Sequence, residues 1–256
     1  MHSFEDSNKK SEIQKIVHLL HSSEETMEYL NSHTHEQLTD LRLKITHAIL
    51  EEQSETWEPL AKVTKFMPNF LNAKVSEDIL GPSITANITY HVPPKEAISI
   101  ANYFSTKFFC DVLEHVIPEK VEPIIRESNA DLIRKAVHEL RKRKNYYLIG
   151  ALIDYTPMQH IHKISMEVDN PDMVLILEFI TKRERMSELL DLYIDTKILG
   201  LIRASVDMNK MDDLLDVFSL TTGKTREKVI GLIKNKLEDS YREKYREPAK
   251  EYDILF

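Results

Sequence analysis

Two pairs of histidines have a spacing at which metal chemistry would be possible. His160 and His162 are separated by one residue, as are His33 and His35. Residues two apart share one face of a β-strand, but on an α-helix they lie roughly 160° apart and cannot bind one metal ion together. The first pair lies in a stretch with helical spacing of apolar residues, and the second has no third ligand nearby in the sequence. We therefore expect no metal site, with the second pair solvated.

The sequence offers equally little support for nucleophilic or acid–base catalysis. Cys110 is the one cysteine and is flanked by large apolar residues in FFCDVL, so we expect a buried structural thiol and no disulfide. No G-x-S-x-G motif is present, and carboxylate pairs such as Glu238 and Asp239 fall on predicted solvent faces. We expect no catalytic residue and no cofactor, and a catalytic pair assembled from distant helices stays open as an alternative.

The composition narrows the possible fold classes. The chain has 256 residues but only 5 glycines, and none of them forms a glycine-rich loop. This argues against P-loop and Rossmann phosphate sites and against β-rich folds, whose tight turns use glycine. The net charge of −8 disfavours binding to nucleic acid or to an anionic membrane overall. No apolar run is long enough to span a membrane, so we expect no membrane insertion and a cytoplasmic protein.

The elements that would position any functional residue are predicted helices, and each repeat unit contains three of them. The clearest repeat has helical patterns at 128–140, 146–155 and 157–168, with a basic turn at 141–145. Equivalent apolar positions recur every 37 to 40 residues. They are Ile98, Val137, Leu177 and Leu214 in the first helix, Val75, Val112, Leu152 and Leu189 in the second, and Ile84, Val121, Ile161 and Ile198 in the third.

The expected fold is all-α, a right-handed superhelix of short three-helix repeats with helical caps. We expect an N-terminal helical cap at 1–60, with helices near 11–21 and 36–53, and repeats at 61–223. A single capping helix would follow at 224–246, and a flexible tail at 247–256. Local signals support the boundaries, because Thr156-x-x-Gln159 has the form of a capping box with Pro157 at the first helical position.

Residues 61–220 resemble armadillo- and HEAT-like superhelices, most clearly in the consecutive amphipathic helices of 101–128 and 177–205. In particular they are similar to the N-terminal cytosolic domain of MgtE-type magnesium transporters and to flagellar motor-switch proteins. The resemblance implies a helical superhelix used for protein contacts, without catalytic residues. The chain is too short for the regulatory pair and membrane domain of those transporters, so magnesium sensing is not carried over.

Basic residues cluster in the turn between the first and second helices of successive repeats, about 41 residues apart. If equivalent turns line one edge of a stack, these residues would form a basic ridge for an acidic protein partner. The predicted partner-binding residues are Arg141, Lys142, Arg143, Lys144, Tyr146, Tyr147, Lys182, Arg183 and Arg185. The alternative is that these cations only complement the dipoles of helix C-termini.

Three functions follow from these patterns. The first is a non-enzymatic interaction or scaffold module that binds a protein on its concave face or on the basic edge. The second is a nucleic-acid-binding repeat protein, whose affinity would fall steeply with salt. The third is a metal- or small-molecule-dependent sensor or enzyme, which would need a deep polar pocket. Partner identity, pathway and oligomeric state stay open.

Overall fold

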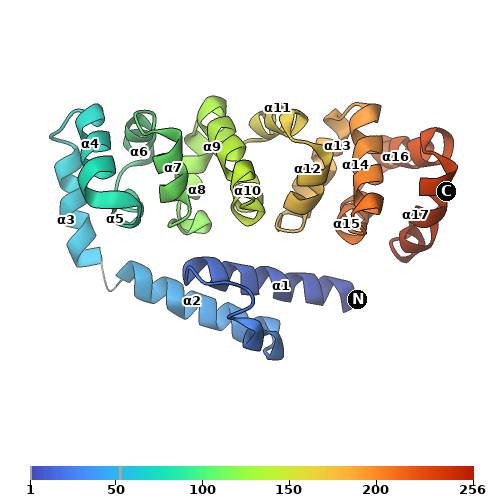
Figure 1. The fold of residues 1–256 in the computed structure, drawn as a ribbon, viewed down its shortest axis with the longest axis horizontal. Helices are drawn as coiled ribbons and strands as arrows, with labels where there is room; N and C mark the ends of the chain where they lie inside the picture. The colour runs from blue at the N-terminus through green and yellow to red at the C-terminus, as the bar shows by residue number, and fades with distance from the viewer. Residues whose placement is uncertain (1, 52–53) are drawn as a thin grey trace. The chain divides into compact units, whose positions relative to one another are not determined.

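The structure, a computed structural model, describes residues 2–51 and 54–256 (Figure 1). Within these residues the regular structure is helical and includes no strand, which confirms the predicted all-α class. The chain divides into two compact units, residues 1–139 and 140–256, and the boundary lies inside α9 (Ala130–Lys142). Each unit is described by itself below.

The N-terminal unit begins with two helices that pack against each other, α1 (His2–Leu19) and α2 (His35–Glu51), joined through the short 3₁₀ helix η1 (Glu28–Ser32). Their shared core includes Ile16, Leu30 and Leu38, each at most 1% exposed. The predicted helices at 11–21 and 36–53 correspond to this pair, although residues 52 and 53 lie outside the described residues.

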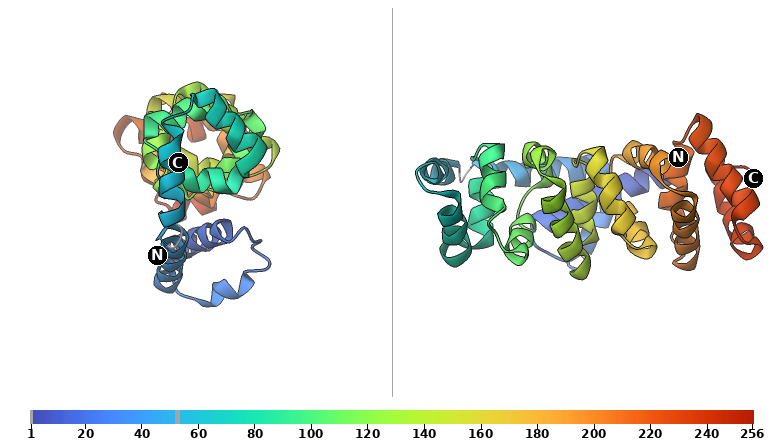
Figure 2. Two further views of the ribbon diagram at one scale, coloured as in Figure 1. Left: turned by 90° about the vertical axis from the view of Figure 1, so that its left-hand side faces the viewer. Right: turned by 90° about the horizontal axis from the view of Figure 1, so that it is seen from above.

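Two repeats follow in the N-terminal unit. The first consists of α3 (Ser54–Thr64), α4 (Asn69–Val75) with the π-helical turn η2 (Ser76–Leu80), and α5 (Gly81–Thr89). The second consists of α6 (Pro94–Ala101), α7 (Thr106–Leu113), and α8 (Glu122–Glu127) preceded by the 3₁₀ turn η3 (Pro118–Lys120). Helix α4 packs against α6, α5 against α7, and α6 against α8, so the helices of this unit stack in a regular order (Figure 2).

The C-terminal unit continues the same order. It contains α10 (Tyr146–Ile153), α11 (Met158–Glu167), α12 (Asn170–Leu177), α13 (Arg183–Leu192), α14 (Asp195–Asp207), α15 (Asp212–Ser219), α16 (Gly223–Lys236) and α17 (Asp239–Glu251). From α10 to α14, each helix packs against the second helix that follows. This packing buries one apolar stripe per helix, and the core side chains include Leu189, Ile198 and Leu214, each at most 1% exposed.

Most equivalent repeat positions are buried, which agrees with the predicted register. Leu152, Leu177 and Ile161 are at most 3% exposed. The first repeat differs, because Val75 and Ile84 are only partly buried. The apolar stripe of α3–α5 is therefore less completely covered than the stripes of later repeats.

Three local predictions differ from the structure. Pro157, rather than Thr156, is the N-cap of α11, and no side chain caps that end, because the Thr156 hydroxyl donates to the Leu152 carbonyl instead. The expected single helix at 224–246 is two helices, because buried Leu237 adopts an extended conformation between them. The expected flexible tail at 247–256 is instead partly helical and partly buried. Helix α17 extends to Glu251, and Ile254 is 2% exposed.

Candidate partner-binding site

The first basic turn makes contacts inside the C-terminal unit. The Arg141 guanidinium lies 2.5 Å from the Asp169 carboxylate and 2.7 Å from that of Asp172, at the start of α12. The Tyr146 hydroxyl donates to the same Asp172 carboxylate at 2.8 Å, and the Tyr147 ring lies edge-on to Phe179. These contacts connect the turn before α10 to α12. The other cations of this turn, Lys142, Arg143 and Lys144, lie at or near the surface, and Lys142 and Lys144 are exposed.

The cations of the second basic turn also make contacts inside the C-terminal unit. Arg183 is 8% exposed and donates to the Leu177 carbonyl at 2.5 Å and to the Asp213 carboxylate at 2.6 Å. Arg185 donates to the carbonyls of Asp154 and Thr156. The Lys182 ammonium lies 4.1 Å from the centre of the Tyr155 ring, within the range of a cation–π interaction.

Arg141 and Arg183 therefore make equivalent bridges to an aspartate about 30 residues further on, in the next repeat. A second carboxylate, that of the partly buried Asp216, adjoins the second bridge. Burial raises the pKa of Asp216, and the nearby Arg183 guanidinium opposes that rise. Three of the nine predicted partner-binding residues, the arginines 141, 183 and 185, thus hold neighbouring segments together. Whether the basic turns also bind a partner remains a prediction.

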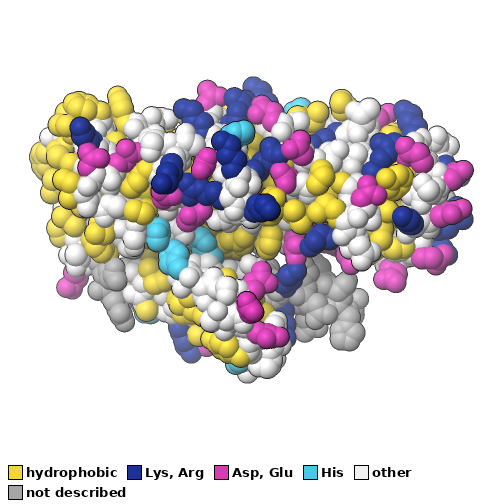
Figure 3. Space-filling view, in the orientation of Figure 1, with side chains coloured by type: hydrophobic (Ala, Val, Ile, Leu, Met, Phe, Trp, Pro, Cys, Tyr) yellow, Lys and Arg dark blue, Asp and Glu magenta, His cyan; other side chains and the backbone are white. Residues whose placement is uncertain are grey.

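A different surface, which the sequence reasoning missed, has the composition of a docking site. Six large apolar side chains of the first repeat are exposed and come from α3, the turn after it, α4 and η2 (Figure 3). We call them the first-repeat face, and they are Leu60, Val63, Phe66, Phe70, Leu71 and Ile79. Phe66 is 87% exposed and Ile79 is 75% exposed, whereas Trp57 and Ala61 on the opposite side of α3 pack into the core. The left-hand view of Figure 2 looks onto this repeat.

The α1–α2 pair was expected to cap the repeats. Helix α2 packs against α3, and side chains of the pair also reach residues further along the N-terminal unit. The His18 ring nitrogen donates to the Val116 carbonyl at 2.9 Å, and the rings of His21 and His115 are hydrogen-bonded at 3.0 Å. Arg42 on α2 lies 3.8 Å from the Glu119 carboxylate. These contacts fall at residues 115–119, well along the chain from the first repeat, whose apolar side chains stay exposed.

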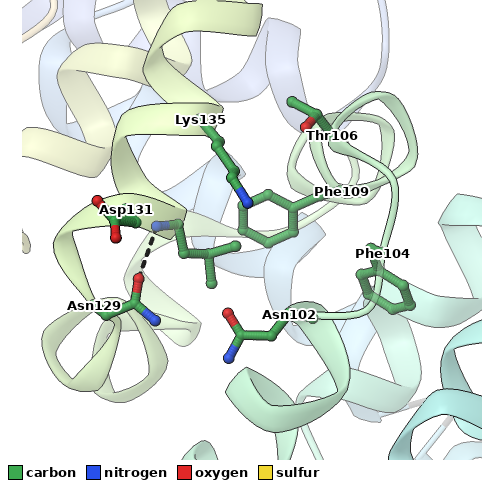
Figure 4. Close-up of a pocket in the computed structure, with 9 residues that line it drawn as sticks. Asn102, Phe104, Thr106, Phe109, Asn129, Asp131 and Lys135 are labelled. Atoms are coloured by element: carbon green, nitrogen blue, oxygen red, sulfur yellow. Dashed lines mark hydrogen bonds between the residues drawn. The ribbon is translucent and has the colours of Figure 1, made fainter.

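A shallow cavity of about 240 Å³ lies between the α6–α7 turn and the start of α9, within the N-terminal unit (Figure 4). Its polar lining consists of Asn102, Thr106, Asn129, Asp131 and Lys135. The Asn129 side chain already accepts the backbone N–H of Leu132 at 2.8 Å, and Asp131 pairs with Arg134. These polar side chains offer hydrogen bonds to a ligand.

The predicted chemistry can be checked at single residues. Cys110 is fully buried, as predicted, with its thiol directed to the Ala136 carbonyl at 3.8 Å. His160 and His162 lie in helix α11, as the pattern predicted, and a ring nitrogen of His162 donates to the Leu192 carbonyl. Over the described residues, no group of three or more histidine, cysteine or acidic side chains is arranged to hold a metal ion.

Comparisons with family models, curated proteins and solved structures find no match to this chain. Among the helices that the structure describes, none combines the length and apolar character needed to cross a membrane.

Proposed function

We propose that this chain is a non-enzymatic helical-repeat module that binds a protein partner through the first-repeat face. The observation that carries the proposal is the exposure of Phe66, which is 87% accessible and belongs to a repeat with five other exposed large apolar side chains. Burying one such side chain contributes about 1.5–3 kcal/mol, and aromatic anchors of this kind dominate the energy of many protein interfaces. Exposed apolar patches of this kind mark interaction sites.

The contacts of the basic turns support a protein partner over nucleic acid. Arg141 and Arg183 already face aspartates, so a phosphate backbone would have to displace those carboxylates. Steep salt dependence, the mark of phosphate binding, is therefore not expected here. The basic edge as a docking site has correspondingly less support than the first-repeat face.

The order of helix packing supports the expected stack of repeats and the resemblance to armadillo- and HEAT-like folds. In such a stack each repeat covers the apolar side of its neighbour, and a partner would cover the exposed apolar side chains of the first repeat. The right-handed superhelical course and the cytoplasmic location stay predictions.

The proposal is tested by photo-crosslinking in the native cell. A photoreactive phenylalanine analogue replaces Phe66 in one variant and Ile194 in the other, a residue of the C-terminal unit that is 59% exposed. We expect a discrete adduct at position 66 that exceeds any adduct at position 194, because the repeat of Phe66 has five further exposed large apolar side chains, whereas Leu192 is the exposed one nearest to Ile194 in the sequence. Equal or absent adducts at the two positions would overturn the proposal.

A further inference from the structure

The turn that carries Phe66 has a hydrogen-bonded backbone. It spans residues 65–68, between α3 and α4, and the Phe66 N–H donates to the Val63 carbonyl at 3.0 Å. The Met67 N–H donates to the Thr64 carbonyl at 3.2 Å. Because the Phe66 side chain is 87% exposed, few contacts of its own can hold it, and its position follows from the backbone of this turn.

A buried side chain of α4 holds the turn from the inside. Asn72 is 4% exposed, and its amide nitrogen donates to the Thr64 carbonyl at 2.8 Å and to the Met67 carbonyl at 3.2 Å. These two carbonyls lie on either side of Phe66 in the chain. One side chain therefore closes the turn, and we call its two hydrogen bonds the Asn72 clamp.

The base of the turn is also tied to the second repeat. The Thr64 hydroxyl lies 2.7 Å from the Ala61 carbonyl and 2.7 Å from the carboxylate of Glu96 on α6. Helix α4, which carries Asn72, packs against α6 as well. The Asn72 clamp thus holds the turn to a part of the N-terminal unit that is itself fixed by packing.

The Asn72 clamp sets the spacing of apolar side chains in the first-repeat face. Phe70 and Leu71 lie directly before Asn72 in α4. Since Asn72 joins α4 to the turn, it fixes Phe66 relative to these two exposed side chains. A partner that contacts all three meets a preformed surface, and binding to such a surface loses less entropy than binding to a mobile one.

The buried amide of Asn72 carries a penalty in stability. Its side-chain oxygen is buried, and within the described residues it has no hydrogen-bond partner. An unpaired buried oxygen destabilises a protein, and an apolar side chain at this position would avoid that penalty. The contribution of Asn72 therefore lies in its two donated bonds, which act on the turn.

We infer that Asn72 is a positioning residue for protein binding, because it holds Phe66 ready for insertion into an apolar pocket of the partner. The inference rests on the proposed function, and it adds a residue that determines the affinity of the first-repeat face. Asn72 itself is buried, so it acts through the turn rather than by touching the partner.

The test replaces Asn72 with leucine, which has the same branching at Cγ but no donor. In the purified full chain, hydrogen exchange of the Phe66 and Met67 amides, followed by NMR, is expected to accelerate roughly tenfold, because the turn loses two hydrogen bonds. Amides of α5, which packs against α3, should keep their wild-type rates. In the native cell, the photo-crosslinked adduct at position 66 is expected to fall roughly threefold or more, because the partner must now order the turn on binding.

The matched control makes the same substitution elsewhere in the first repeat. Asn87 on α5 donates to the Ser83 carbonyl of its own helix at 3.1 Å, and Asn87→Leu removes that bond without changing the turn. This control should leave the exchange of the Phe66 amide and the adduct at position 66 as in the wild type. If Asn72→Leu does not fold by circular dichroism, Asn72→Ala removes the same donor without added bulk and is measured in the same way.

Three outcomes would overturn the inference. Wild-type exchange of the Phe66 and Met67 amides would show that Asn72 does not hold the turn, and equal acceleration in α5 would show that it holds the whole repeat instead. An unchanged adduct at position 66 despite a loosened turn would show that docking does not depend on the clamp. The proposed function fails in a different way. If the wild-type chain gives no more adduct at position 66 than at position 194, the first-repeat face is not a docking site, and the inference falls with it.

Discussion

At the scale of single residues, the arginines of the basic turns could serve either as surface cations or as partners in structural ion pairs. Arg183 is buried and faces Asp213 at 2.6 Å, with Asp216 at 3.7 Å. A cation in a turn near a helix end suggests a surface role, but the aspartates that pair with it lie about 30 residues further on. Nothing in the local pattern predicts that pairing.

Replacing Arg183 with methionine is expected to destabilise the protein by about 1–3 kcal/mol. The substitution leaves the carboxylates of Asp213 and Asp216 without the guanidinium between them, and it leaves the Leu177 carbonyl with the Ile180 N–H as its remaining donor. The figure lies below the cost for a fully buried pair, because both aspartates are partly exposed. Urea unfolding followed by circular dichroism measures the change.

The matched control for Arg183→Met is Arg203→Met, which breaks an exposed ion pair with Glu238. This control is expected to cost less than about 1 kcal/mol, because exposed pairs are screened by solvent. If the two substitutions cost the same, Arg183 is not the structural bridge that its contacts indicate.

At the scale of elements, the contact between the α1–α2 pair and residues 115–119 depends on neutral histidines. Burial lowers the pKa of His18, and burial followed by the nearby His21 lowers the pKa of His115. The groups that face them include Glu119 near His18, and Asp111 and Glu114 near His115. Because the folded state binds protons less readily than the unfolded state, this contact stabilises the protein above about pH 6.5 and loses its contribution as the pH falls below that value.

We therefore expect hydrogen exchange of the α1 amides, corrected for intrinsic rates, to accelerate between about pH 7.5 and pH 5.5. Combining His18→Gln with His115→Gln should flatten this dependence, since glutamine does not titrate there and can still donate to the Val116 carbonyl. Unchanged protection of α1 in the wild type across this range would show that the histidines do not control the contact.

The helices themselves were predictable wherever their signals are local. The predicted helices at 128–140, 146–155 and 157–168 correspond to α9, α10 and α11, because apolar spacing and the turn residues between them lie within one short stretch. The break between α16 and α17 was missed, since the charged pattern continues through it. It is buried Leu237 that stops the first helix, and burial depends on tertiary packing.

At the scale of the whole molecule, the sequence predicts the all-α class but not the surface that we propose as a docking site. The periodicity of the sequence indicates that a stripe such as that of Leu60 and Val63 is apolar, but it does not indicate which residues cover that stripe. An N-terminal cap was expected at 1–60. Side chains of α1 and α2 contact residues 116–119, while Leu60 and Val63 stay exposed. The first-repeat face could be recognised only from the exposure of its side chains.

The most direct measurement of the central claim is hydroxyl-radical footprinting of Phe66 and Ile79, in cells and in the purified chain at high dilution. The exposure of the two side chains, 87% and 75%, predicts strong labelling of the dilute chain. A partner on the first-repeat face should protect both in cells, while Ile194 in the C-terminal unit is labelled equally in the two conditions. Equal labelling of Phe66 in cells and at high dilution would contradict the claim that this face is a docking site.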